Sequence, residues 1–218
     1  MDPVNQRMTP LHVAAELSSP VALRQGWIML DSLLAYQIAL RSGILTSDLA
    51  HMQPIDIPVA KEPGGRFHLC SASFGEVLES ELQHTVKRPA VEQFQIRGDA
   101  RIRRVDIAKA ANKGYRIPRP VTHYARLEWW LVGQKEAIEE LLSTVTHLGH
   151  KRSVGLGRVE RWSVEPCDEW DGFPVARDGR PLRPLPKDWP SLVNPQLSYH
   201  TLTFPYWDKS REELCAIP

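Results

Sequence analysis

The feature that most constrains the fold is a strand pattern followed by a helix pattern, a glycine-rich loop and a second strand pattern. Residues 121–132 alternate between two sets of side chains, which predicts a strand. Residues 135–148 repeat apolar side chains at helical spacing, and residues 157–165 return to a strand pattern. A strand, a helix and a strand in this order form half of a layered fold that combines helices with a sheet.

The same order occurs earlier in the chain. Residues 9–17 predict a strand, residues 31–42 predict a helix with Asp31 as its N-cap, and residues 66–78 predict another strand. The two halves together give the order βαβ–βαβ, which is ferredoxin-like. We therefore expect an α+β, ferredoxin-like (RRM-like) domain over residues 1–165.

The strand at 121–132 is expected to present two different faces. One face should pack on the helices, and the other should meet a partner or RNA. The expected core face holds Val121, Ala125, Leu127, Trp129 and Leu131, and the opposite face holds Thr122, Tyr124, Arg126, Glu128 and Trp130. Trp27 and Trp162 are also expected in or near the core.

Charge is distributed unevenly along the chain. The whole sequence holds 27 basic and 26 acidic side chains, which argues against a histone-like polycation. Residues 87–119 hold ten basic and three acidic side chains, whereas the rest of the chain holds 17 and 23. Apolar residues interleave with these charges, so this basic arm is expected to form a hairpin that lays cations along a phosphate backbone, with a solvated loop as the alternative. Its candidate RNA-binding residues are Arg97, Arg101, Arg103, Arg104, Lys109, Lys113, Tyr115, Arg116 and Arg119.

The loop between the second helix and its strand has the sequence LGHKRSVGLGRVERW at residues 148–162. Its glycines permit backbone conformations closed to other residues, and Gly149 is expected at the C′ position of the helix. Free N–H groups, a hydroxyl and several cations in one turn suit a phosphate, although a helix end followed by a tight turn is the plain structural alternative. Walker A loops and dinucleotide fingerprints are excluded, because both need a strand before the loop and a helix after it. The candidate RNA-binding residues are Gly149, His150, Lys151, Arg152, Ser153, Gly155, Gly157 and Arg158.

Residues 166–218 differ from the rest in composition. They hold nine of the 18 prolines together with Trp170, Trp189, Tyr206 and Trp207. A proline-rich segment with this many aromatic side chains is expected to wrap the body as an extension, with one late strand at residues 198–204.

Several classes of protein are disfavoured. Three cysteines without CxxC spacing argue against a disulfide scaffold or a zinc ribbon, and fit a reducing cytoplasm. The metal-binding HExxH motif and the paired carboxylates of metal nucleases are missing from the sequence, so no metal and no cofactor is expected. No apolar run approaches the ~18 residues of a membrane helix, so no membrane association is expected either.

Two segments of the sequence resemble a known family. The glycine-rich basic loop before the last strand, and residues 20–39 (PVALRQGWIMLDSLLAYQIA), resemble the RAMP superfamily of CRISPR RNA-binding proteins. In that superfamily an LDGLLAY-type stretch opens the first helix, and here residues 30–36 (LDSLLAY) stand in its place, with Ser32 for the usual glycine. The combination is most similar to the small, Cas-five-like subunit that binds the crRNA handle in type IV effector complexes, over about residues 9–165.

The resemblance implies a function. A subunit of this kind holds the 5′ repeat-derived handle of the crRNA without catalysis and caps the backbone of the complex. The implied partners are the crRNA and the backbone and large-subunit-like proteins of a CRISPR effector complex, while contact with target DNA near the protospacer-adjacent motif stays open. The basic arm at residues 87–119 stands where the family's inserted thumb hairpin would be.

Two alternative functions are also compatible with the sequence. The first is a metal-independent crRNA-processing endoribonuclease, with His123, Tyr124, Tyr115, Lys113 and His150 as candidate catalytic residues. His123 and Tyr124 are adjacent on a strand and point to opposite faces, so no acid–base pair emerges and we expect no catalytic residues. The second alternative is a protein-interaction module that makes no RNA contact.

Overall fold

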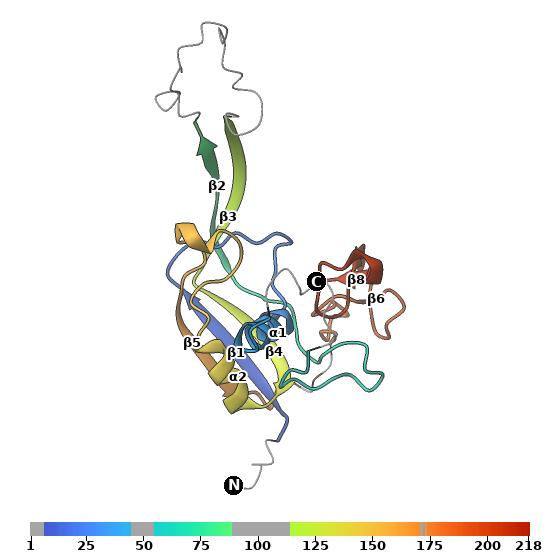
Figure 1. Cartoon of the computed structure of the whole chain (residues 1–218). Coiled ribbons are helices and arrows are strands. Elements are labelled where there is room, and N and C mark those ends of the chain that lie inside the picture. The colour runs from blue at the N-terminus through green and yellow to red at the C-terminus, as the bar shows by residue number, and fades with distance from the viewer. Residues whose placement is uncertain (1–6, 45–54, 89–113, 171, 173) are drawn as a thin grey trace, which may run out of the picture.

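The structure is a computed structural model, and it describes residues 7–44, 55–88, 114–170, 172 and 174–218. Its body is a three-stranded antiparallel sheet in the order β4-β1-β5. The central strand β1 (Thr9–Leu17) pairs with β4 (Arg126–Gly133) on one side and with β5 (Val159–Pro166) on the other. Two helices, α1 (Leu30–Arg41) and α2 (Lys135–Leu142), lie over one face of this sheet (Figure 1).

The main core lies between this sheet and the two helices. Alternate residues of β1 and β4 point into it, as the period of a strand requires. Trp129 is fully buried, and its indole N–H donates a hydrogen bond of 2.9 Å to the carbonyl of Ile28. The other central side chains include Leu11, Val13 and Ala15 of β1, Leu127 and Leu131 of β4, Leu30 and Leu34 of α1, and Ile138 and Leu142 of α2.

The first helix differs from its prediction at its start. It begins at Leu30, and its N-cap is Met29, whose side chain makes no capping hydrogen bond. Asp31 was predicted as the N-cap, and that prediction is wrong. Asp31 lies inside the first turn and is buried, because its carboxylate is bound by distant groups of the chain.

The second helix is shorter than its prediction and ends at Leu142. The hydroxyls of Ser143 and Thr144 donate back to the carbonyls of the preceding turn, at 2.7 and 3.1 Å, which competes with continued helix formation. Val145 and Leu148 are buried as the apolar pattern predicts, although they lie in the turn after the helix and not in the helix itself. Gly149 is therefore not the C′ residue of this helix, and that prediction is also wrong.

The single strand predicted at residues 121–132 is two strands. Residues before Ala125 belong to β3 (Tyr115–Tyr124), which leaves the body, and residues after it form β4. Leu127, Trp129 and Leu131 are buried as predicted, and so is Val121. Ala125 is exposed, because it lies at the break, where its carbonyl accepts a hydrogen bond of 3.0 Å from Leu17 N–H.

The strand predicted at residues 66–78 is interrupted. Isolated bridges join Cys70 to Leu131 and Phe74 to Glu128 along the outer edge of β4, and the regular strand β2 (Val77–Lys87) begins only afterwards. One reason for the interruption is that Ala72 N–H donates to the carbonyl of Leu182, in the C-terminal part of the chain, instead of to a strand partner.

Strands β2 and β3 form an antiparallel hairpin that projects from the body (Figure 1). Its register runs from Lys87 opposite Tyr115 to Val77 opposite Tyr124, with an irregularity between Val77 and Glu79. Both ends of the basic arm lie in this hairpin, whereas residues 89–113 lie outside the described residues.

The C-terminal part of the chain forms a second small sheet rather than the one late strand predicted. Its order is β6-β8-β7, with β6 (Leu185–Pro186), β7 (Gln196–His200) and β8 (Glu213–Ile217). A separate apolar cluster supports this C-terminal unit (residues 174–218), which is the reason that the sheet forms. The buried members of that cluster are Phe67, Val175, Leu185, Leu202 and Cys215. In the parts of the chain that the structure describes, no helix is long and apolar enough to cross a membrane.

Candidate nucleic-acid interface

The glycine-rich loop (residues 148–158) lies at the base of the hairpin (Figure 1). Its backbone is fixed to the segment that follows β1, because Gly157 N–H donates to the Pro20 carbonyl at 2.8 Å and His150 N–H donates to the Ala22 carbonyl at 2.9 Å. Val21, which lies between Pro20 and Ala22, exchanges two hydrogen bonds of 2.9 Å with Thr122 of β3. One short segment therefore ties the loop to the hairpin.

Two glycines make this packing possible. Gly149 and Gly157 both have positive φ angles, of 73° and 68°, which favour glycine. A Cβ atom at Gly149 would lie 2.5 Å from the Ala22 carbonyl oxygen, and one at Gly157 would collide with the Leu148 carbonyl. Only glycine thus lets the loop approach its support closely enough.

The side chains of the loop are presented outward. His150, Lys151, Arg152, Ser153 and Arg158 are all exposed. Lys151 adopts a left-handed conformation with φ of 60°, which is uncommon for a residue with a side chain, just before the short 3-10 helix η4 (Arg152–Val154).

The backbone of the loop is less available than the sequence predicts. The N–H groups of His150, Val154, Gly155 and Gly157 donate to carbonyls of the protein, and Arg158 N–H donates to the Ser19 hydroxyl at 2.8 Å. The N–H groups of Lys151, Arg152 and Ser153 have no such acceptor among the described residues. These N–H groups, the loop cations and the Ser153 hydroxyl are therefore the groups best placed to meet a phosphate.

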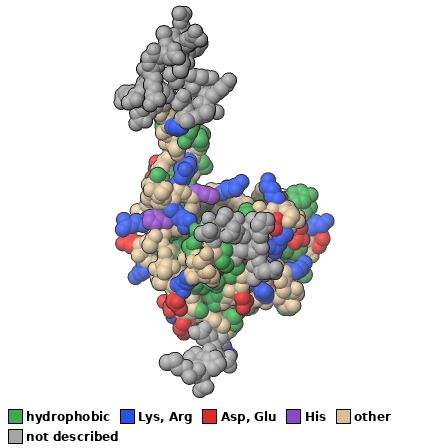
Figure 2. Space-filling model, viewed as in Figure 1, with side chains coloured by type: hydrophobic (Ala, Val, Ile, Leu, Met, Phe, Trp, Pro, Cys, Tyr) green, Lys and Arg blue, Asp and Glu red, His purple; other side chains and the backbone are tan. Residues whose placement is uncertain are grey.

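The basic arm contributes fewer described residues. Tyr115 and Arg116 are exposed on β3, Arg119 is half-buried there, and Arg116 Nη2 lies 3.4 Å from His84 Nδ1 across the hairpin. Figure 2 shows Lys, Arg and His side chains gathered where the hairpin leaves the body. The remaining arm candidates lie outside the described residues; they are Arg97, Arg101, Arg103, Arg104, Lys109 and Lys113.

A cavity of about 450 Å³ opens beside the loop. Its walls come from residues 23–36, from the loop and from residues 204–207 of the C-terminal unit. Five aromatic side chains line it, namely Trp27, Tyr36, Phe204, Tyr206 and Trp207. Trp207 is 49% exposed. The cationic and imidazole side chains in the same walls are Arg24, His147, His150 and Arg152.

Sequence reasoning missed most of this cavity. Trp27 was expected in or near the core, and it is half-buried in the cavity wall. The Arg152 guanidinium lies 5.9 Å from the centre of the Tyr36 ring, so the loop and α1 meet at this point. The sequence signal that was available is the aromatic cluster at residues 204–207, but nothing in the sequence places it beside the loop.

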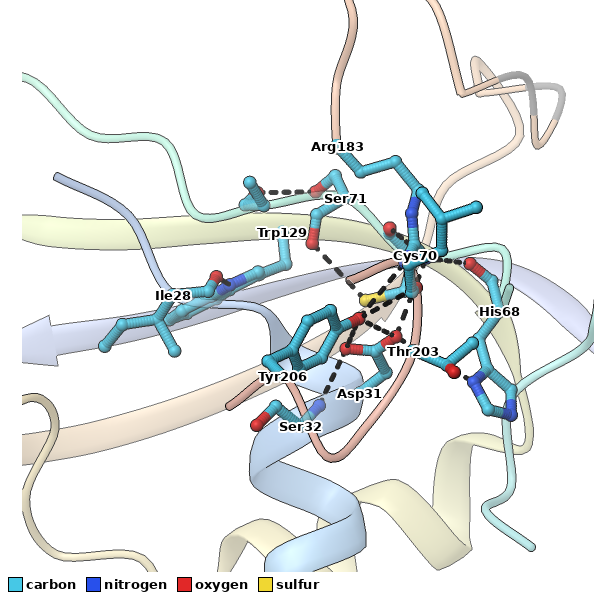
Figure 3. A network of polar contacts seen from close by, with 12 residues as sticks. Ile28, Asp31, Ser32, His68, Cys70, Ser71, Trp129, Arg183, Thr203 and Tyr206 are labelled. Atoms are coloured by element: carbon cyan, nitrogen blue, oxygen red, sulfur yellow. Dashed lines mark hydrogen bonds and ion pairs between the residues drawn. The ribbon is translucent and has the colours of Figure 1, made fainter. Parts of the chain in front are cut away.

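A buried polar network fixes the C-terminal wall of the cavity (Figure 3). Arg183 and Asp31 are 0% and 1% exposed, and Arg183 Nη1 lies 3.6 Å from Asp31 Oδ2. Arg183 also donates to the carbonyls of His68, Cys70 and Leu202.

Tyr206 completes this network. Its hydroxyl donates to the two carboxylate oxygens of Asp31, at 2.8 and 2.9 Å, so the residue next to Trp207 is held on the first turn of α1. Burial, and then the negative charge of Asp31, raise the pKa of Tyr206 well above its ordinary value of 10. The phenol therefore stays protonated and keeps donating at neutral pH.

The candidate catalytic residues are spread over different places. His123 lies on the hairpin, where its Nε2 is 3.5 Å from Glu81 Oε1, and Tyr124 packs against the main core. His150 lines the cavity together with His147, which the sequence analysis did not single out. Lys113 lies outside the described residues. Among the described residues, no group of three His, Cys, Asp or Glu side chains could hold a metal ion.

The hairpin, β4, the glycine-rich loop, β5 and the C-terminal unit together correspond to a known family. The family model of the CRISPR type IV associated protein Csf3 matches residues 79–218, which is more than half of the chain. The chain belongs to this family. No curated protein matches the sequence.

The Csf3 match confirms the coarser part of the sequence-based expectation. The chain is a type IV CRISPR-associated protein, and its family indicates a component of a type IV CRISPR complex. The matched region includes residues 166–218, where the sequence analysis found no motif, so the C-terminal unit belongs to the family pattern. It does not include β1 or the LDSLLAY stretch of α1, on which the RAMP resemblance partly rests.

Proposed function

We propose that this Csf3-family protein is a non-catalytic crRNA-binding subunit that holds the 5′ handle and caps the backbone of a type IV effector complex. The observation that carries the proposal is the joining of exposed loop cations to a cavity lined by aromatic side chains. Its partners are then the crRNA and the backbone and large-subunit-like proteins of the complex.

The chemistry of this surface suits single-stranded RNA. Proteins bind such strands by stacking unpaired bases on aromatic or guanidinium planes and by neutralising the phosphates with cations. The cavity offers Trp27, Tyr36 and Trp207 as stacking faces. Arg152 of the loop lines the cavity, and the exposed Lys151 is its neighbour in the sequence. Its volume of about 450 Å³ falls in the range of pockets that hold compact ligands.

The topology supports a ferredoxin-like RAMP body for this subunit. The sheet order β4-β1-β5 is antiparallel throughout, and residues 70–74 bridge to the outer edge of β4. A βαββαβ chain with its first strand in the centre has this arrangement when the second strand occupies the outer edge next to the third. The interrupted segment at residues 70–74 would then be that second strand.

The hairpin supports the part of the proposal that concerns protein partners. Leu78, Leu82 and Val86 are each more than half exposed along β2. Apolar side chains in a row on a projecting arm are typical of a surface that a partner covers. In an assembled complex the hairpin would lie against a neighbouring backbone subunit, as a thumb does.

Binding of repeat-derived RNA to the purified chain, or to its complex, tests the proposal. We expect affinity to fall steeply with salt, because cations that contact phosphates release counterions. Reversing two loop charges, with Lys151→Glu and Arg152→Glu together, should weaken binding at least about tenfold and flatten the salt dependence. Trp207→Ala should cost about 1–3 kcal/mol if a base stacks there.

The matched control is Arg177→Glu, because Arg177 is an exposed cation of the C-terminal unit that does not line this cavity. It should leave RNA binding unchanged. Unchanged RNA retention in the Lys151 and Arg152 double variant, with normal folding by circular dichroism, would count decisively against the proposal.

One observation favours a second candidate function, metal-independent cleavage of precursor crRNA. His147 and His150 line the same cavity, and two imidazoles near one phosphate are able to act as general base and general acid. Repeat RNA incubated with the chain in excess chelator would then yield one site-specific product, and His150→Ala would abolish it. Absence of any such product from the wild-type chain rules this candidate out.

A further inference from the structure

A second cavity, of about 320 Å³, lies between residues 55–68 and residues 203–211. Phe204 lines both this cavity and the aromatic one, so the same stretch of the C-terminal unit separates them. Three cationic side chains line the second cavity, and they are Lys61, Arg66 and Arg211.

His68 lies in the wall of this cavity and carries an unpartnered polar atom. The residue is 7% exposed, and its Nδ1 lies 3.8 Å from Asp31 Oδ2. Its Nε2 is buried and has no hydrogen-bond partner among the described residues. Buried polar atoms are nearly always hydrogen-bonded in folded proteins, so an unpaired nitrogen here indicates a partner that the protein alone does not supply.

The charges of the cavity walls leave a positive surplus. Asp31 is the acidic side chain among the lining residues, and Arg183 and Tyr206 already bind its carboxylate. Lys61 has no ion pair with any described residue.

The two arginines of the cavity already have partners, but each keeps N–H donors that can bind a ligand. Arg66 Nε lies 3.6 Å from Glu62 Oε1, and Arg211 Nη2 donates to the Thr203 hydroxyl at 2.5 Å. A guanidinium carries five N–H donors, so these contacts do not use up either side chain.

We propose that this cavity binds a phosphate group, held by Lys61, Arg66 and Arg211 and by an N–H of His68 at Nε2. A phosphate is a compact anion with several acceptor oxygens, which matches three cations and one buried donor around one space. The inference stands on this cavity alone and does not depend on RNA binding at the glycine-rich loop.

The proposal predicts that the contribution of His68 to binding grows as pH falls. The groups that face His68 are the carboxylates of Asp31 and Asp56 and the cations of Arg183 and Lys61. Burial lowers the pKa of His68 in the free protein, whereas a bound phosphate favours the imidazolium. The imidazolium would donate from Nε2 to the phosphate, while its Nδ1 lies 3.8 Å from the Asp31 carboxylate. The contribution of His68 to affinity should therefore be greater at about pH 6 than at about pH 7.5.

Calorimetric titration of the full chain with inorganic phosphate is the direct test. We expect one saturable site, weakened at least about fivefold by Lys61→Gln and by Arg211→Gln. Lys61 is exposed, so its variant folds normally, and Arg177→Gln is the matched control because Arg177 is an exposed cation outside this cavity. His68→Gln should weaken phosphate binding more at about pH 6 than at about pH 7.5.

Competition distinguishes the two sources of such a phosphate. If repeat RNA displaces inorganic phosphate from the wild-type chain, the natural ligand is a phosphate of the RNA, and if both bind together it is a free phosphate or nucleotide. The proposal is overturned if no saturable phosphate binding occurs, or if Arg177→Gln weakens binding as much as Lys61→Gln does.

Discussion

The hairpin β2–β3 and the C-terminal unit are both attached to the same body sheet, yet they are stabilised in opposite ways. Leu82 of the hairpin is 57% exposed, whereas Leu185 of the C-terminal unit is fully buried. The hairpin contacts the body through the small apolar cluster of Val121, Ala22 and Leu156, and through Tyr124 at its base. The C-terminal unit shares a buried apolar cluster with Phe67 of the preceding part of the chain and inserts Arg183 beneath α1.

The difference separates a part that completes the fold from a part that is kept free for partners. A two-stranded hairpin is marginal by itself, and its strand ladder and cross-strand pairs are its main support. The C-terminal unit instead supplies the counter-charge for a buried carboxylate of the body, so the two fold together. Substitutions in these two regions should therefore have very different effects on the free energy of unfolding.

The largest effect is expected where the C-terminal unit joins the body. Asp31→Ala removes one partner of a fully buried pair and leaves the Arg183 charge uncompensated, which should cost about 3–5 kcal/mol of stability in urea unfolding. The control is Arg41→Ala, which breaks the exposed Arg41–Glu140 pair at 2.7 Å and should cost at most about 1 kcal/mol. Equal losses from the two substitutions would contradict the buried network as the point of attachment.

The same substitution in each region sharpens the comparison. Leu185→Ala removes a fully buried side chain and should cost about 2–5 kcal/mol. Leu82→Ala removes an exposed one and should change the stability of the isolated chain by no more than about 0.5 kcal/mol. If the hairpin serves a partner, however, Leu82→Ala should weaken assembly of the complex, as measured by co-purification.

The smallest effect is a dependence of stability on pH. Burial lowers the pKa of His68 below its ordinary value of 6.5, and burial also lowers that of His200 in β7. The unfolded chain therefore takes up a proton before the folded chain does, so stability should fall as pH falls below about 6.5. Thermal unfolding between about pH 7.5 and 5.5 measures this fall, which should be shallower in His68→Gln. An unchanged slope in that variant would show that His68 does not contribute.

Much of the body could be predicted from the sequence. Strands β1 and β5 and the inward residues Leu127, Trp129 and Leu131 follow from alternation, because a strand with one buried face must alternate. Alternation does not reveal where a strand changes sheet, so the break at Ala125 between β3 and β4 was missed. It does not reveal a burial partner either, and β3 is mostly exposed where β4 is buried.

The candidate site was only half predictable for a related reason. The glycine-rich loop is a local pattern, and its glycines and cations can be read from neighbouring positions in the sequence. The cavity beside it is assembled from Trp27, Tyr36 and Trp207, which are brought together by tertiary contacts alone. Asp31 shows the same limit, because a carboxylate before a run of leucines looks like a helix cap until its partner at Tyr206, 175 positions away, is known.

The strand order of the C-terminal unit has a consequence for synthesis on the ribosome. Strand β8 lies between β6 and β7 and follows both of them in the sequence, so neither has a sheet partner until β8 has been made. The body strands, by contrast, are complete once β5 has emerged. Chains are built from the N-terminus and fold as they emerge, so Asp31 stays solvated during translation until Arg183 and Tyr206 have been made. Seating the C-terminal unit on α1 is then the closing step of vectorial folding, and it completes the aromatic cavity last.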